Sequence, residues 1–460
     1  MSVDIAVLGA GPAGLAAAWY CARRGHSVAV LERAESVGGL AASISVGSQR
    51  VDLGSHRLHP SIRPDLLADL TTLLGSDLQR RRRHGRIRLD GRWLAFPLRP
   101  LDLARNARVL FASRVLADVA ATPLRRRRQP VGDNFAAAVR TQLGPTIATS
   151  FYEPYAVKLW GVPAEELSAE LFRRRVSSRS AAGVLRTALR RGPAPSFWYP
   201  AGGFGTITEA IAGAVTSLGG IVELGVDVER ITPRPDHVII DCAGRPPIHA
   251  RTVVSTIPGR SLAALTGAPA DVRDAVTGLQ HRGAVLVYLV VPRPYYTDFD
   301  AHYFPEPAVR IARLSEPKRY RDSLVDPPAT TVLCAELPAT VGDTVWEATD
   351  SELAELVGDD LAVAELPDPA PLAVHVERRA HVYPIYHLGF DAAQGALDRW
   401  IAGLTGVIAV GRQATFAHDN THHALAMGHA VAACLGTDAR VDPAAWQVAC
   451  ATFADHVVED

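Results

Sequence analysis

The sequence predicts an α/β fold that begins with a Rossmann-like βαβ unit able to bind a dinucleotide. Three observations support this fold class. The first sixty residues alternate apolar strand-like runs with a glycine-rich turn and a helix-like stretch. Residues 61–200 have mostly helical patterning, and residues 282–385 contain strand-like runs such as GAVLVYLVV. With 48% apolar and 21% charged residues, the 460-residue chain has the balance of a globular protein with a large core.

The βαβ unit carries the pattern G-x-G-x-x-G at Gly9, Gly11 and Gly14. Gly9 makes the tight turn, Gly11 lets a pyrophosphate approach the backbone, and Gly14 lets the helix pack closely against the strand. The N-terminus of the helix offers free N–H groups to phosphates, and Glu32 can accept hydrogen bonds from a ribose. We expect strands at residues 4–8 and 27–31 and a helix at residues 15–24.

The composition excludes several functional classes. Lys+Arg and Asp+Glu are equal at 48 each, so net charge indicates neither a nucleic acid partner nor a membrane surface. Only two basic residues are lysines, Lys158 and Lys318. The five cysteines are scattered without a CxxC pair, which argues against a disulfide scaffold and favours a reducing cytoplasm. No run reaches the roughly 18–20 apolar residues of a membrane span, and the chain starts without a secretory signal pattern.

A second glycine pair, Gly38 and Gly39, follows Glu32 in the stretch RAESVGGLAAS. This stretch resembles the second glycine motif of the FAD-binding flavoproteins that include amine oxidases, protoporphyrinogen oxidases, phytoene desaturases and UDP-galactopyranose mutases. NAD-dependent dehydrogenases usually lack it. The resemblance implies that the cofactor is FAD and that the domain is a Rossmann-like FAD-binding domain of the glutathione-reductase type.

Two later stretches fit the same resemblance. In GVDVERI, Val228 occupies the place of the residue whose backbone meets adenine. Residues 406–435 look like the last strand, the Gly411 loop and the closing helix, which in the family points its N-terminus at the flavin pyrimidine. The resemblance implies FAD contacts from Gly9, Gly11, Pro12, Ala13, Gly14, Glu32, Arg33, Gly38, Gly39, Leu40, Gly54, Ser55, His56, Val228, Gly411, Arg412, Asn420, His423, Ala424 and Leu425.

FAD-domain sequence at both ends and in the middle of the chain implies that other domains are inserted into it. We expect the discontinuous FAD-binding domain at residues 1–60, 197–260 and 400–435, a helical subdomain at 61–196, a substrate-binding domain of antiparallel sheet at 261–399, and a tail at 436–460. Inside the insertions we expect a β-hairpin at 86–96 that turns at Asp90-Gly91, and a helix at 350–362.

The segment FYEPYAVKLWGVPAEELSAELFRRRVSSR (151–179) resembles one that UDP-galactopyranose mutases share with bacterial protoporphyrinogen-oxidase-like proteins. FWYPAGGFG (197–205) resembles the oxidase segment more than the mutase segment. In the mutases two arginines bind the substrate diphosphate, and the resemblance places them at Arg179 and, through a pattern R-I-x-x-x-K, at Arg310. The implied substrate contacts are Tyr155, Trp160, Arg179, Arg310, Tyr383 and Phe416.

The stretch VDLGSHRLHP carries His56, Arg57 and His59 where the mutases have G-x-H-x-F-H. In the superfamily this loop approaches the flavin, and Gly54 would let the backbone pass close to the ring. The three side chains are therefore candidate catalytic groups. Since the sequence shows no further ligand cluster, we expect no metal site.

Two reactions fit these motifs. We expect an FAD-dependent oxidoreductase that transfers hydride from a small-molecule substrate to flavin N5. The alternative is a flavin-dependent mutase acting on an anionic sugar nucleotide, with reduced FAD and no net redox change. Phe416 stands where the mutases have a tyrosine, and Asn420 to His423 resembles the N-x-D-H of the oxidase-like proteins, with His422 in place of Asp. Both features favour the first reaction. A flavin-binding protein with a structural or non-redox role is a third class.

Other interpretations stay open for single features. The candidates Tyr155, Trp160 and Tyr383 could be core aromatics, and Arg310 could form a surface ion pair. The arginine runs at 80–83 and 125–128 are either solvated charge beside loops or a patch that attracts anions or lipids.

Overall fold

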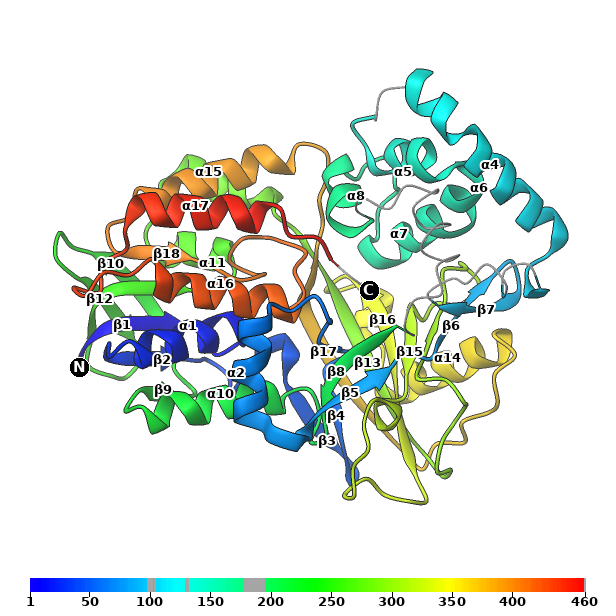
Figure 1. The fold of residues 1–460 in the computed structure, drawn as a ribbon, viewed down its shortest axis with the longest axis horizontal. Helices are drawn as coiled ribbons and strands as arrows, with labels where there is room; N and C mark the ends of the chain where they lie inside the picture. Colours follow the sequence, from blue (N-terminus) through cyan, green and yellow to red (C-terminus); the bar gives the residue numbers. More distant parts are fainter. Residues whose placement is uncertain (97–101, 103–104, 129–131, 177–194, 459–460) are drawn as a thin grey trace.

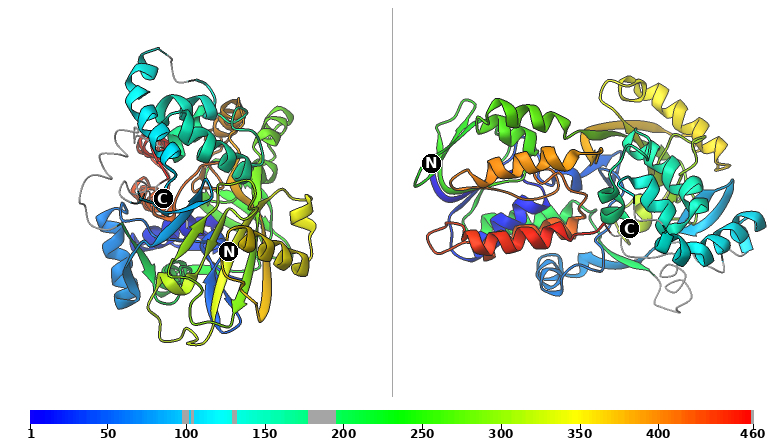
Figure 2. Two further views of the ribbon diagram at one scale, coloured as in Figure 1. Left: turned by 90° about the vertical axis from the view of Figure 1, so that its right-hand side faces the viewer. Right: turned by 90° about the horizontal axis from the view of Figure 1, so that it is seen from above.

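The computed structural model describes residues 1–96, 102, 105–128, 132–176 and 195–458. They form two large β-sheets and a helical lobe (Figure 1). The first sheet and its helices contain the N-terminus, and the second sheet lies beside them. The helical lobe packs above the second sheet in this view, and the C-terminal end lies where the three parts meet (Figures 1 and 2).

The first sheet has the strand order β10-β11-β12-β1-β2-β9, with β18 also paired to β12. β1 pairs in parallel with both β2 and β12, which confirms the predicted βαβ unit. Strands of this kind are covered on both faces, which explains why they read as continuous apolar runs. The bounds are β1 Ser2–Leu8, β2 Val28–Leu31, β9 Ile221–Glu223, β10 Val228–Pro233, β11 Val238–Cys242, β12 Ile248–Ser255 and β18 Val407–Ala409.

Helix α1 (Pro12–Arg23) starts at the glycine turn and packs against α10 (Thr206–Ser217) and α16 (Thr421–Ala433). Gly428 allows α16 to approach α1, because a Cβ atom there would lie 2.5 Å from the carbonyl oxygen of Ala13. This packing brings the N-termini of α1 and α16, far apart in the sequence, to the same end of the sheet.

The second sheet has the order β17-β13-β16-β15-β14-β6-β7. Its central strands, β13 and β16, are buried along almost their whole length. The described helix α14 (Asp350–Val363), which confirms the predicted helix at 350–362, packs on β13 and β17. The bounds are β6 Gly85–Leu89, β7 Arg92–Phe96, β13 His281–Val291, β14 Ala301–Tyr303, β15 Arg313–Ser315, β16 Thr331–Ala339 and β17 Ala373–Pro384.

The predicted hairpin forms, but it belongs to a different part of the molecule than expected. Asp90 and Gly91 have φ angles of 53° and 69°, as a two-residue turn between β6 and β7 requires. β6 then pairs in parallel with β14, which makes the hairpin the edge of the second sheet. Assigning all of 61–196 to a helical subdomain was therefore wrong, because strand pairing over long sequence distances decides where the hairpin lies.

Two other boundaries differ from those expected. Helix α11 (Gly259–Leu265) packs on β10, and α15 (Phe390–Ala402) packs on β18, so both belong with the first sheet. Their buried residues Leu262 and Leu397 share a core with that sheet. Helix α17 (Pro443–Ala454), inside the expected tail, packs on α16.

The helical lobe consists of α4 (Val109–Arg128), α5 (Phe135–Leu143), α6 (Pro145–Ile147), α7 (Glu153–Trp160) and α8 (Ala169–Arg175). Asn134 caps α5 by accepting a hydrogen bond from the N–H of Ala137, and Gly161, with a φ of 74°, ends α7. In the part of the chain that the structure describes, every helix is too short or too polar to cross a bilayer.

Candidate active site

A cavity of about 2790 Å³ lies where the two sheets and the helical lobe meet. The glycine turn and the N-terminus of α16 form one wall, charged residues and tyrosines of the second sheet form another, and apolar residues of the lobe form the third. Small-molecule pockets have volumes of roughly 300–1,000 Å³. This cavity therefore has room for a cofactor and a substrate together.

The glycine turn opens onto the cavity as the sequence predicts. A Cβ atom on Gly14 would lie 2.0 Å from the carbonyl oxygen of Gly9, so only glycine fits beneath the turn. A Cβ atom on Gly11 would meet no protein atom within 4 Å, which leaves open space beside the N-terminus of α1. Gly39 lies against Gly11, where a Cβ atom would be 3.5 Å from the Cα of Gly11. These positions form a cradle for a pyrophosphate.

Glu32 is held at the end of β2 by backbone donors. Its Oε2 accepts a hydrogen bond from the N–H of Ala10 at 2.7 Å, and its Oε1 accepts one from Ala34 at 2.8 Å. Each oxygen keeps a further lone pair for a ribose hydroxyl. Val228 and Arg33 line the same part of the cavity.

Sixteen of the twenty predicted cofactor contacts line the cavity, and the other four support it from behind. Gly14 and Gly38 shape the two turns, and Gly38 has a φ of 113°. Leu425 packs in the core beside α1, and His423 belongs to a polar network at the start of α16. We therefore assign these four residues positioning roles rather than contacts.

The loop 54–59 brings His56 to the cavity wall. Its ring stacks on Phe204 with 5.3 Å between ring centroids, and its buried Nδ1 has no hydrogen-bond partner among the described residues. Enclosure by the protein, together with Arg313 and Arg412, lowers the pKa of His56 to about 3. His56 is therefore neutral near pH 7 and can orient a ligand by a hydrogen bond but carries no charge.

Arg57 and His59 also line the cavity, but their partners differ from those of His56. Arg57 donates to Asp300 Oδ1 at 3.1 Å and lies over the ring of Tyr320 at 4.8 Å, so it joins the loop to the second sheet. His59 lines the cavity, and its Nδ1 is 2.7 Å from Ser61 Oγ, which in turn is 3.2 Å from Nε2 of His422. Of the three catalytic candidates, Arg57 is thus committed to a structural ion pair.

Asp52, which precedes the loop 54–59, anchors it to the surrounding structure. Its Oδ2 accepts from the hydroxyl of Tyr199 at 2.6 Å, and its Oδ1 accepts from Ser43 Oγ and the N–H of Phe204. Burial raises the pKa of Asp52, although these donors oppose the rise. The carboxyl group is therefore part of the scaffold.

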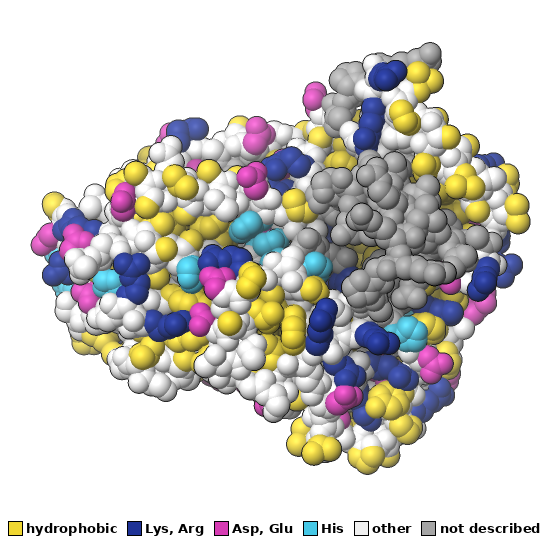
Figure 3. Space-filling model, in the orientation of Figure 1, with side chains coloured by type: hydrophobic (Ala, Val, Ile, Leu, Met, Phe, Trp, Pro, Cys, Tyr) yellow, Lys and Arg dark blue, Asp and Glu magenta, His cyan; other side chains and the backbone are white. Residues whose placement is uncertain are grey.

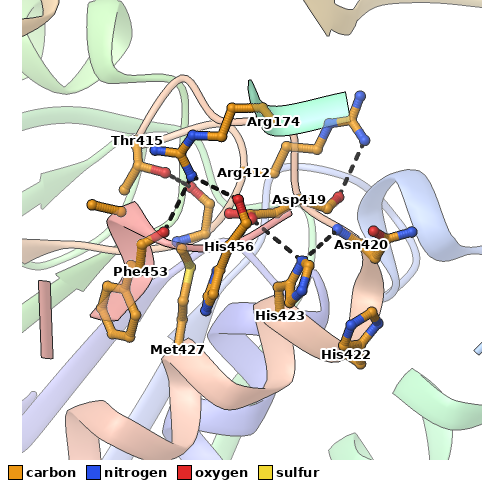
Figure 4. A network of polar contacts seen from close by, with 12 residues as sticks. Arg174, Arg412, Thr415, Asp419, Asn420, His422, His423, Met427, Phe453 and His456 are labelled. Carbon is orange, nitrogen blue, oxygen red and sulfur yellow. Dashed lines mark hydrogen bonds and ion pairs between the residues drawn. The ribbon is translucent and has the colours of Figure 1, made fainter. Parts of the chain in front are cut away.

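Polar residues at the start of α16 form a network with the C-terminal segment (Figure 4). Asp419 Oδ1 is 3.2 Å from Nδ1 of His456 and 3.5 Å from Nδ1 of His423. Arg174 of α8 donates to the carbonyl oxygens of Phe453 and His456 at 3.2 and 3.1 Å. The segment after α17 thus ties the helical lobe to the N-terminus of α16.

Asp419, His423 and His456 could each offer one metal ligand atom, all within 4.8 Å of one another. Two features favour a hydrogen-bond network instead. The Nδ1 of His423 accepts the N–H of Asn420 at 3.2 Å. The two imidazoles stack at 4.3 Å with 13° between their planes, so one ion cannot lie in both ring planes. The absence of a metal site remains a prediction, which this stacking supports.

The predicted substrate residues separate into two groups. Tyr155, Trp160 and Tyr383 line the cavity, and burial raises the pKa of both tyrosines, so each phenol is a neutral donor. Arg179 lies outside the described residues. Phe416 does not line the cavity but packs in the core against Tyr386.

Arg310 was predicted wrongly as a cavity residue. Its Nε donates to Oδ1 of Asp360 at 2.9 Å, and 47% of its side chain is exposed, which is the surface ion pair kept open above. Arg313, three residues later on β15, lines the cavity instead. The pattern R-I-x-x-x-K places its lysine five residues after its arginine. Arg313 and Lys318 have this spacing, whereas no lysine lies five residues after Arg310, so the spacing could have identified Arg313.

Arg313 is held by Glu336 of β16. Its Nε and Nη2 donate to the two carboxylate oxygens at 2.8 and 2.7 Å, and Glu336 Oε1 also accepts the N–H of Ser55 at 2.8 Å. Burial opposes the charge of Arg313, but Glu336 together with Tyr303 and Tyr383 raises the guanidinium pKa. The pair thus fixes a cation between the loop 54–59 and the second sheet.

The profile of the family described as flavin containing amine oxidoreductase matches residues 12–431. The chain belongs to this family. Among solved structures, a reduced UDP-galactopyranose mutase is 20% identical, with 94% of this chain and 93% of that chain covered and a TM-score of 0.78. A protein from Exiguobacterium sp. 255-15 that has been provisionally assigned as a protoporphyrinogen oxidase is 17% identical, with 94% of this chain and 98% of that chain covered and a TM-score of 0.73.

A short curated match lies outside this group. The thiamine thiazole synthase of Pyrobaculum neutrophilum is 68% identical over 37 residues, which are 8% of this chain. The chain spans only 14% of the length of that relative, so the match concerns a local segment.

Membership of the family makes FAD the cofactor of this flavoenzyme, and the residues present fit it. The open space at Gly11 would hold the pyrophosphate, and Glu32 would hold a ribose. The N-terminus of α16, with Arg412 beside it, would face the flavin pyrimidine. Burial and the neighbouring Arg175 lower the pKa of Arg412, because both disfavour its positive charge. The positive charge of these two arginines would favour negative charge on a flavin bound beside them.

Proposed function

We propose that this flavoenzyme is an FAD-dependent oxidoreductase whose substrate has an apolar body and one polar or anionic end. The observation that carries the proposal is the apolar wall that the helical lobe contributes to the cavity. Its side chains are Ala112, Val115, Val119, Phe135, Leu143, Ile147, Phe151 and Leu159. Burying apolar substrate surface there contributes roughly 25 cal/mol per Å².

The polar end of the substrate would bind at Arg313, Tyr155 and Tyr383. Tyr155 and Tyr383 are electrostatic neighbours of Arg313, and both are neutral hydrogen-bond donors. Glu336 holds the guanidinium of Arg313 in one orientation through two hydrogen bonds. An anionic group bound here would fix which carbon of the substrate lies next to the flavin.

When bound, FAD accepts a hydride from a substrate C–H bond at N5, and O₂ or another acceptor later takes up the two electrons. The chain's own residues position and enclose the reactants. Neutral His56 offers a hydrogen-bonding nitrogen at the cavity wall, and the apolar wall of the lobe limits access of water. From a carbon that carries a neutral amino group, hydride transfer leaves an iminium ion, so the transfer needs no charged acid or base at this place.

The test is a panel of compounds given to oxidised holoenzyme, with oxygen uptake and dye reduction as readouts. Aliphatic carboxylates of increasing chain length that carry an amino group should be oxidised, with KM falling as the chain lengthens. Leu143→Asp, which places a charge in the apolar wall, should remove this dependence while FAD stays bound. Equal turnover of short and long compounds by the unmodified enzyme would contradict the proposal.

A second candidate is a sugar-nucleotide mutase, and one observation favours it. Arg313 matches the mutase arginine spacing and lies in the cavity with Tyr155, Trp160 and Tyr383. Holoenzyme reduced beforehand with dithionite and supplied with UDP-galactopyranose distinguishes the two reactions. Formation of the furanose isomer would support the mutase, and we expect the sugar nucleotide to be recovered unchanged.

A further inference from the structure

Helix α4 lies on the outside of the helical lobe (Figure 1). It presents an apolar face there. At 100° per residue, four apolar side chains of this helix fall within an arc of about 120°. They are Val109, Leu110, Leu116 and Leu124, which are 86%, 62%, 60% and 50% exposed. The opposite side of the helix, with Phe111, Asp118 and Thr122, is buried. The helix therefore has one face buried in the protein and an apolar face in solvent.

Basic residues flank the exposed apolar face. Residues 105–128 contain seven arginines and one acid, Asp118, which is buried and paired with Arg125. Arg108 lies 3.5 Å from Asp90, while Arg126 and Arg127 are exposed beyond the last apolar residue. In the space-filling view, hydrophobic and basic side chains lie side by side over this outer part of the lobe (Figure 3, upper right). The surface thus combines apolar contact area with strong positive charge.

The same helix forms part of the cavity wall. Val115 and Val119 line the cavity from their half-buried positions. Leu116 lines the cavity and is also 60% exposed, so it marks the rim between the cavity and the outer face. An apolar molecule leaving the outer face of α4 would therefore meet apolar side chains on its way into the cavity.

We propose that α4 docks this flavoenzyme onto the surface of an anionic lipid bilayer. Val109, Leu110, Leu116 and Leu124 enter the headgroup region, and the arginines bind lipid phosphates. A second copy of the chain fits this face less well, because a symmetric contact would bring the exposed Arg114, Arg126 and Arg127 of one copy close to those of the other. Docking of this kind needs no membrane-spanning helix, and it does not depend on the proposed reaction.

The test uses FAD-loaded full-length protein and vesicles of phosphatidylcholine alone or mixed with phosphatidylglycerol, separated by sedimentation. The unmodified protein should bind the mixed vesicles and bind phosphatidylcholine weakly. The double variant Arg126→Gln/Arg127→Gln should bind roughly 25-fold more weakly, since each charge contributes about fivefold. Leu110→Glu/Leu116→Glu should lose binding by at least tenfold.

A matched control is Leu324→Glu/Leu372→Glu, which changes two leucines that are 106% and 66% exposed and lie outside the lobe. This control should bind the mixed vesicles like the unmodified protein, and all variants should keep one FAD per chain. The proposal is overturned if the unmodified protein stays in the supernatant, or if the control loses as much binding as the α4 variants. The face would be assigned to a second copy instead if light scattering shows a dimer, Leu110→Glu/Leu116→Glu breaks that dimer, and the unmodified protein does not bind vesicles.

Discussion

Lys158 is the residue whose replacement tests the construction of the site most sharply. It lies on α7, one turn after Tyr155, and its Nζ is enclosed by backbone carbonyl oxygens of the loop between β14 and β15. Its Nζ lies 2.8, 2.6 and 3.3 Å from the carbonyl oxygens of Glu306, Val309 and Ile311, and that of Phe304 is also within hydrogen-bond distance, so the three N–H groups are shared among four acceptors. This loop leads directly to Arg313. Lys158 therefore holds the predicted anion-binding arginine in place from the other wall of the cavity.

We expect Lys158→Met to lower the free energy of unfolding by about 3–5 kcal/mol. Burial lowers the pKa of Lys158 to about 8, so the amine is still mostly charged near pH 7 and can donate three hydrogen bonds. Each bond from a charged donor contributes about 1.5–3 kcal/mol, and the buried carbonyls would lose their donor. Part of this loss is offset because the ammonium no longer has to be desolvated. Thermal denaturation of the holoenzyme should show Tm lowered by ~5–10 °C.

Lys318 supplies the matched control. It is buried, and its Nζ donates to the carbonyls of Pro294 and Thr330, each at 3.0 Å, and to that of Pro327. Like Lys158 it does not line the cavity, but the segments that it contacts do not carry Arg313. Lys318→Met should lower Tm by a similar amount and leave the substrate KM unchanged. Lys158→Met should also raise KM by roughly tenfold, because Arg313 moves. The reasoning fails if Lys158→Met leaves Tm unchanged, or if Lys318→Met raises KM to the same extent.

Three further predictions concern the cofactor, the substrate and pH. Gly11→Val should fold but lose FAD, because its side chain would enter the pyrophosphate space, whereas Gly213→Val, equally free of contacts but outside the cavity, should keep it; the flavin-to-protein ratio measures both. Arg313→Met should raise the KM for an anionic substrate at least tenfold with FAD retained, and Arg310→Met should leave it unchanged; equal effects would refute the assignment. Burial lowers the pKa of His302 to about 3, so the unfolded chain binds a proton that the folded chain does not, and stability is lost as pH falls from 6.5. Between pH 6.5 and about 5, His302 should account for about 1.5–2 kcal/mol of the loss in unfolding free energy. Urea denaturation at the two pH values should show the loss smaller by this amount in His302→Gln.

Local sequence determined the cofactor half of the site. A tight turn, a close backbone approach and a helix N-terminus depend on a few neighbouring residues, so Gly9, Gly11 and Gly14 could be interpreted without the fold. The turn at Asp90-Gly91 could be predicted in the same way, because the two consecutive positive φ angles of such a turn depend only on these two residues. The same local reasoning could not show that β6 pairs with β14, more than 200 residues away.

The substrate half depends on contacts between distant segments. Arg310 and Arg313 differ by three residues, and the course of the intervening loop decides which one faces the cavity. That course is set by Lys158, about 150 residues earlier. Only the arginine-to-lysine spacing in the sequence pointed to Arg313. No sequence pattern predicted the contact between His456 and Asp419, because it joins two segments through a single pair of side chains.

The central claim is that an apolar substrate reduces this flavin directly. The most direct measurement mixes oxidised holoenzyme anaerobically with the best compound of the aliphatic panel and follows the visible absorbance of the bound flavin. The account predicts complete bleaching, one oxidised product per flavin, and recovery of the colour when oxygen or another acceptor is admitted. A flavin that stays oxidised with every aliphatic compound, while dithionite-reduced enzyme isomerises UDP-galactopyranose without net redox change, would contradict it.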